Sequence, residues 1–174
     1  MEKDYQIILF DKLNRFINKY YKNEILKGVI FLIAALLFFL LLFSLIEYLS
    51  RFNGNLRSVL FWGYIIINIV ISVQFVLIPL FHLFRIGKVI NYADAAAIIG
   101  SHFPEIDDKI LNILQLNELS QENRGLINAS IQQKTKNIQP FSFRSIINFK
   151  ENRKHLKWIL IPVFIFLFFI FSGN

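Results

Sequence analysis

Hydrophobic residues in this chain form three continuous blocks, separated by segments in which apolar and polar positions alternate. The block 29–46 contains one hydroxyl group and no charge, and the block 59–84 contains no Asp, Glu, Lys or Arg. The block 158–171 is shorter. About 20 apolar helical residues cross a ~30 Å hydrocarbon layer. The pattern therefore predicts an all-α membrane protein with transmembrane helices over 29–49, 59–84 and 158–174.

The link between the first two predicted spans is short. Residues 50–58 read SRFNGNLRS, and the Asn53–Gly54 pair at their centre is typical of a turn. We therefore expect the two spans to be antiparallel neighbours. The second is longer than a bilayer requires and contains Pro79, so we expect it to tilt or bend.

The third block has three interpretations: a core or re-entrant segment, a tail anchor, or a complete span that continues beyond Asn174. Arg153, Lys154 and Lys157 precede it directly, and Trp158 stands where an interfacial aromatic residue would. These residues favour a true span, and we expect the natural chain to continue past Asn174.

The first 28 residues repeat apolar side chains at helical spacing, which predicts an amphipathic helix over 1–28. Two placements are equally open for it. It could lie on the membrane surface with its cations near anionic headgroups, or it could pack on the segment 91–138. The cations are Lys12, Arg15, Lys19 and Lys22.

Residues 85–138 are expected to form a small helical domain between the second and third spans. Asn91 with Asp94 matches a capping box for a first helix that ends at Gly100, and Pro104 suits the start of a second helix. Ser120 is expected to cap a third. The apolar face of the second comprises Ile106, Ile110, Leu111 and Leu114, and that of the third comprises Leu126, Ile127 and Ile131.

Pro140 ends this domain, and residues 139–157 are predicted to form a basic interfacial helix that leads into the third span. Its cations are Arg144, Lys150, Arg153, Lys154 and Lys157.

Charge predicts the orientation. The net charge is +7, and residues 1–28 and 85–157 carry more Lys and Arg than acids. By the positive-inside rule, both segments are expected in the cytoplasm. The loop 50–58 and the C-terminus are then extracytoplasmic. It has no Cys, so no thiolate chemistry is available.

No catalytic constellation is present, so we expect no enzyme activity, no cofactor and no metal site. His102 with Glu105, Asp107 and Asp108 is better explained as a polar turn and an acidic first helical turn than as a metal site. No RNA-binding motif occurs, and the modest excess of positive charge suits headgroups better than nucleic acid; ribosome contact is left open.

Polar residues inside the predicted spans are candidates for helix–helix or partner contacts, with a transport pathway as the alternative. In the second span these are Gly63, Tyr64, Asn68, Ser72 and Gln74. At the end of the first span, Glu47 could reach water or pair with Arg51 four residues on.

The stretches IIGSHFPEIDDKILNILQL and INFKENRKHLKW, with most of the remaining chain, resemble the start of the large Bacteroidota inner-membrane proteins of the domain-of-unknown-function 4175 family. The resemblance implies an N-terminal membrane module followed by a long extracytoplasmic region, without assigned catalytic residues.

Three functions follow. The first is a non-enzymatic anchor or scaffold module that holds an extracytoplasmic region within a multi-subunit envelope complex. The second is an accessory subunit of the Sec-type protein-export apparatus, and the third is a small transporter or channel subunit. The expected partners are the lipid bilayer and other integral membrane proteins, translocon components among them.

Overall fold

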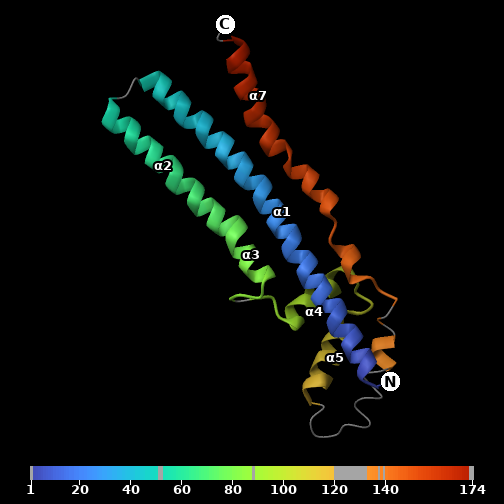
Figure 1. Ribbon diagram of the computed structural model, residues 1–174. Coiled ribbons are helices and arrows are strands. Elements are labelled where there is room, and N and C mark those ends of the chain that lie inside the picture. The colour runs from blue at the N-terminus through green and yellow to red at the C-terminus, as the bar shows by residue number, and fades with distance from the viewer. Residues whose placement is uncertain are drawn as a thin grey trace. The chain divides into compact units, whose positions relative to one another are not determined.

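The computed structural model describes residues 2–50, 53–87, 89–119, 133–136, 138 and 140–172. Throughout these residues the regular structure is helical, which confirms the expected all-α class (Figure 1). The chain divides into two compact units. The first unit comprises Met1–Tyr20 and Lys88–Asn148, and the second comprises Tyr21–Gly87 and Phe149–Asn174.

Helix α1 runs without a break from Glu2 to Ser50 (Figure 1). The predicted amphipathic helix and the first predicted span are therefore one element, which supplies residues to both units. No glycine or proline break separates them, since Gly28 is accommodated inside the helix. Two segments, Ile7–Ser50 and Gly54–Leu83, are long and apolar enough to cross a membrane.

In the second unit, α1 forms an antiparallel hairpin with the helical run that follows it. This run consists of α2 (Gly54–Ser72), the π-helix η1 (Val73–Leu77) and α3 (Ile78–Leu83). Three aromatic pairs run along the hairpin in opposite chain directions: Phe43–Tyr64, Phe31–Phe75 and Tyr21–His82. The short link thus produces the antiparallel neighbours that the sequence predicts.

The second helical run changes its winding immediately before Pro79. Proline lacks an N–H, so it cannot donate the α-helical bond to the carbonyl of Phe75. Here the chain widens into the π-turn, in which the Ile78 N–H donates to the Val73 carbonyl five residues earlier. The irregularity expected from Pro79 is therefore a π-helix within a continuous helical run.

The first unit is built on α4 (Tyr92–His102) and α5 (Asp107–Leu119), which pack on each other. The predicted capping box is confirmed, because Asn91 Oδ1 accepts from the Asp94 N–H at 2.6 Å while Asp94 Oδ2 accepts from the Asn91 N–H at 3.4 Å. The expected end at Gly100 is two residues early.

The predicted start of the second helix at Pro104 is wrong. Residues 104–106 form a turn in which the Ile106 N–H donates to the Phe103 carbonyl, and α5 begins at Asp107. Ile106 and Ile110 are fully buried as expected, and Ile113 joins them. Of the proposed third helix, residues 133–136 and 138 are helical, and Ile138 is 1% exposed. Ser120 and the expected face Leu126, Ile127 and Ile131 lie outside the described residues.

The single basic helix expected over 139–157 is also wrong. Two 3₁₀ helices occur, η2 (Phe143–Ile146) and η3 (Phe149–His155). Ile147 between them has an extended backbone, and its side chain is buried. The last apolar block forms α7 (Lys157–Ser172), which follows η3 in the second unit.

Candidate functional site

The candidate site is a basic groove in the first unit, where α1 meets the segment around η2. Two hydrogen bonds join these distant parts of the sequence. Lys12 Nζ donates to the Phe141 carbonyl at 3.2 Å, and Lys19 Nζ donates to the Arg144 carbonyl at 2.5 Å. Four of the predicted basic residues, Lys12, Arg15, Lys19 and Arg144, therefore belong to one local structure.

The groove encloses about 310 Å³. Its apolar lining includes Phe141 and Phe143, and its cations are Lys12, Arg15 and Arg144. Asp11 contributes the one carboxylate among the lining residues, and Arg15 Nε holds it at 2.8 Å. The lining side chains therefore carry more positive than negative charge.

Lys12 is the least solvated cation of the groove. Its ammonium lies 5.6 Å from the centre of the Phe143 ring, and burial lowers the pKa of Lys12 below its usual value. Desolvation lowers the pKa because it disfavours the charged ammonium form. A bound anion next to Lys12 would stabilise that charged form and raise the pKa again.

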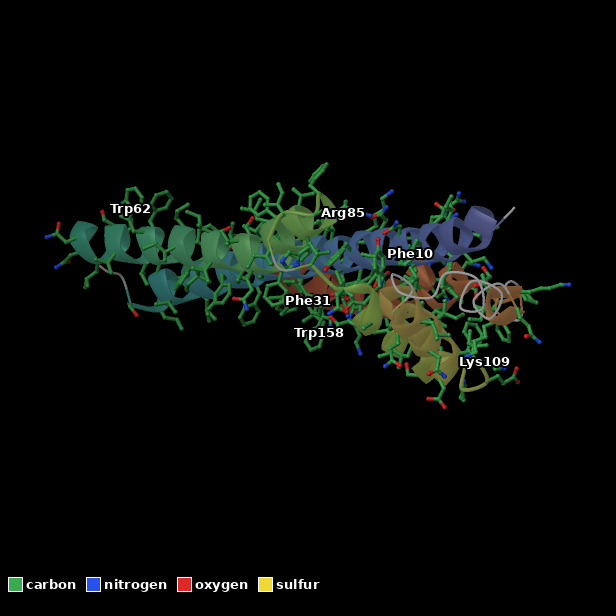
Figure 2. All side chains as sticks on the ribbon, turned by 90° about the horizontal axis from the view of Figure 1, so that it is seen from below. Phe10, Phe31, Trp62, Arg85, Lys109 and Trp158 are labelled. Carbon is green, nitrogen blue, oxygen red and sulfur yellow. The ribbon has the colours of Figure 1, made fainter. Side chains whose placement is uncertain are left out.

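The apolar face of the N-terminal part of α1 is covered by protein in the first unit. Leu9, Leu13 and Phe16 are at most 1% exposed. Phe10, labelled in Figure 2, packs edge-on against Tyr92 of α4 at 5.0 Å, and the Tyr92 hydroxyl donates to Asn14 Oδ1. This packing supports the second of the two placements, because these side chains are unavailable for insertion into lipid.

The remaining predicted basic residues belong to the second unit and do not gather around the groove. Lys157 lies 5.9 Å from the ring of Trp158, labelled in Figure 2, at the start of α7. All are exposed: Lys22, Lys150, Arg153, Lys154 and Lys157.

The polar residues of α2 and η1 divide into inner and outer positions of the hairpin. Asn68 is 9% exposed, its Nδ2 donates to the Tyr64 carbonyl at 2.8 Å, and its Oδ1 has no partner among the described residues. The Tyr64 hydroxyl donates to the Leu36 carbonyl of α1 at 3.4 Å. Ser72 is half-buried and Gln74 is exposed. Contacts of any of these residues with a partner remain a prediction.

The two long helices come close together at Gly28, which the sequence analysis did not select. A Cβ placed there would lie 1.8 Å from the Phe75 carbonyl oxygen, whereas a Cβ on Gly63 would meet nothing within 4 Å. Gly63 therefore does not mark a helix contact among the described residues. A glycine inside a helix costs about 1 kcal/mol relative to alanine, which could have identified Gly28 as a packing position.

Glu47 at the end of α1 pairs with a different arginine from the one considered in the sequence. Arg57 Nε lies 2.7 Å from Glu47 Oε1, and this bridge links the two helices on either side of the turn. Arg51 lies outside the described residues.

The three histidines contact a backbone carbonyl or an aromatic ring. His102 Nδ1 is 3.2 Å from the Ile98 carbonyl, and the His82 and His155 rings lie beside Tyr21 and Phe31. Across the described ranges, no three His, Asp or Glu side chains come together as a metal site requires.

These features define an all-helical protein with two helices long and apolar enough to cross a membrane. No family model, curated protein or solved structure matches the chain. The resemblance to the domain-of-unknown-function 4175 family therefore stays an expectation.

Proposed function

We propose that this protein is a non-enzymatic anchor and scaffold module of a bacterial inner-membrane complex. In this proposal α1 and the α2–α3 run cross the membrane as a hairpin, and α7 crosses it a third time. The first unit lies in the cytoplasm, and the module holds an extracytoplasmic region of a larger envelope protein.

The observation that carries the proposal is the exposure of the hairpin. Only 11% of the most apolar 18-residue window of Ile7–Ser50, and 6% of that of Gly54–Leu83, is buried within the chain. A core helix of a water-soluble protein would be mostly buried, so this surface suits lipid or helices of other subunits. Trp62, labelled on α2 in Figure 2, is 62% exposed.

The third crossing is supported by α7. All residues from Trp158 to Phe171 are apolar, and large side chains such as Phe164, Phe168 and Phe171 are more than 60% exposed. The helix of 16 residues is about 24 Å long, which is short for an average bilayer. The basic residues before it could extend it by reaching the headgroup region.

A scaffold also suits the interior of the hairpin. The amide of Asn68 bonds the backbone of its own helix, and Gly28 allows close approach to the Phe75 carbonyl. These contacts favour tight helix packing over a solvated transport pathway. The resemblance to the Bacteroidota family supports the role in a larger envelope protein.

Cysteine labelling tests the topology directly, because the chain has no native Cys. Asn55→Cys, in the exposed first turn of α2, should react with a membrane-impermeant maleimide in intact spheroplasts. Lys109→Cys, on the exposed side of α5, should react only after the membrane is opened. Labelling of both at equal rates in intact spheroplasts would exclude the proposed orientation.

The scaffold role is tested by recovering the natural protein from its own membrane in mild detergent. We expect it to co-purify with other integral membrane proteins at fixed stoichiometry, and cross-linking will show whether export components are among them. Recovery as a monomer without partners would refute the scaffold role, even if the topology were correct.

A further inference from the structure

The geometry points to the basic groove of the first unit as a binding site for a phosphate-bearing anion, either the headgroup of an anionic phospholipid or a soluble phosphate ester. This goes beyond an anchoring role, because it assigns a ligand to one defined group of residues.

The shape of the groove suits a small ligand. Its volume of about 310 Å³ is at the lower end of the ~300–1,000 Å³ of small-molecule sites. Apolar surface of the half-buried Phe141 lies next to three cations, so the site offers both charge and an apolar wall. An anion with an organic part attached can use both.

The charges are arranged for an external anion. The lining contains three cations, Lys12, Arg15 and Arg144, and one carboxylate, Asp11, which pairs with Arg15 at 2.8 Å. The Arg144 side chain is exposed, and no described residue pairs with it. Guanidinium groups bind phosphate oxygens in a bidentate manner, which makes Arg144 the principal contact.

The groove is held in place by structure on both sides. Phe143 is 2% exposed and Leu13 of α1 is fully buried, so the two walls are anchored in the core of the first unit. The bond from Lys12 Nζ to the Phe141 carbonyl ties one wall to the other. A ligand would therefore meet cations whose backbone positions are already set, which reduces the entropic cost of binding.

The experiment uses the full chain in a neutral detergent and has two arms. In the lipid arm, native mass spectrometry measures retention of phosphatidylglycerol against phosphatidylcholine. In the soluble arm, calorimetry measures binding of glycerol 3-phosphate and inorganic phosphate. Preference for phosphatidylglycerol identifies a lipid headgroup, and binding of glycerol 3-phosphate without lipid preference identifies a soluble ligand; either result supports the site.

Arg144→Gln should weaken binding in the responding arm by about tenfold or more, since it removes a charged hydrogen-bond donor. Lys109→Gln is the matched control, because it removes one exposed positive charge from α5 outside the groove lining. It should change binding by less than about twofold. Both substitutions are on the surface, so circular dichroism should show unchanged helicity.

Two results would overturn the inference. One is the absence of binding in both arms. The other is an equal loss for Arg144→Gln and Lys109→Gln, which would mean that overall positive charge, and not the groove, attracts the anion.

Discussion

The two units contain similar aliphatic and aromatic residues but use them in opposite ways. In the first unit, Ile99, Ile106 and Ile110 are 0% exposed, and polar residues separate the short apolar groups. In the second unit, the apolar residues are continuous, and Phe38 and Phe61 are more than half exposed. Apolar spacing therefore distinguishes residues that form a protein core from residues that need another apolar environment.

The strongest test of this comparison uses two phenylalanines of the same helix, α1. Phe16 is 0% exposed and Phe38 is 54% exposed. Phe16→Ala should lower the free energy of unfolding of the first unit by about 3–5 kcal/mol, because it leaves a cavity in the core. Thermal denaturation of the full chain in detergent, with limited proteolysis of the first unit, will measure this.

Phe38→Ala is the control and should change stability by less than about 0.5 kcal/mol in detergent. If α1 crosses the membrane as proposed, the Phe38 side chain contacts detergent whether or not the first unit is folded. Equal losses for the two variants would show that the units do not differ in this respect.

A smaller effect is expected for the glycines of the hairpin. Gly28→Ala should destabilise the helix pair by about 1–3 kcal/mol, because the new Cβ overlaps the Phe75 carbonyl and forces the helices apart. Disulfide formation between cysteines introduced at Phe31 and Phe75, whose rings are 6.3 Å apart, should also slow.

Gly63→Ala is the matched change on α2, where the added methyl group meets no described atom. It should be neutral, or stabilising by about 0.5–1 kcal/mol through lower backbone entropy in the unfolded chain. Destabilisation by Gly63→Ala alone would instead indicate a partner helix packed at that point.

In the first unit, Asn91→Ala removes the capping box of α4 and should lower the unfolding free energy by about 1 kcal/mol. Asn112→Ala, at an exposed position inside α5, has no cap to lose and should change stability by less than about 0.5 kcal/mol. Chemical denaturation followed by circular dichroism compares them. A loss at Asn112 equal to that at Asn91 would argue against the cap.

The smallest effect is expected for the ion pair at the turn of the hairpin. Glu47 and Arg57 side chains are 39% and 64% exposed, so their coupling energy should be about 0.2–1 kcal/mol. A double-mutant cycle with Glu47→Gln and Arg57→Gln measures it. The coupling should shrink in 1 M salt, and a value unchanged by salt would contradict a solvent-exposed pair.

Local features were predictable where one short segment contains all the information. The capping box needs only Asn91 and Asp94, and the antiparallel hairpin follows from two apolar blocks with a nine-residue link. The single helix over 139–157 was not predicted correctly, because burial of Phe143 and Ile147 against other parts of the first unit outweighs the local helical pattern.

The candidate groove was only half predictable. Its cations were named from their positions in basic, apolar-patterned segments, but Lys12 and Arg144 were grouped with residues that belong to the other unit. Two hydrogen bonds join α1 to the segment around η2: Lys12 donates to the Phe141 carbonyl, and Lys19 donates to the Arg144 carbonyl. A sequence does not show which carbonyls a distant lysine will reach.

The sequence by itself determined that the chain is helical and that two of its helices are long and apolar enough for a bilayer, because the length of an apolar block and its helical hydrogen bonds are local properties. Only the tertiary structure decided which apolar side chains are covered, that Gly28 and not Gly63 meets the other helix, and that Lys12 and Arg144 line one groove. These depend on contacts between residues far apart in the chain, whose energies are set by packing and desolvation.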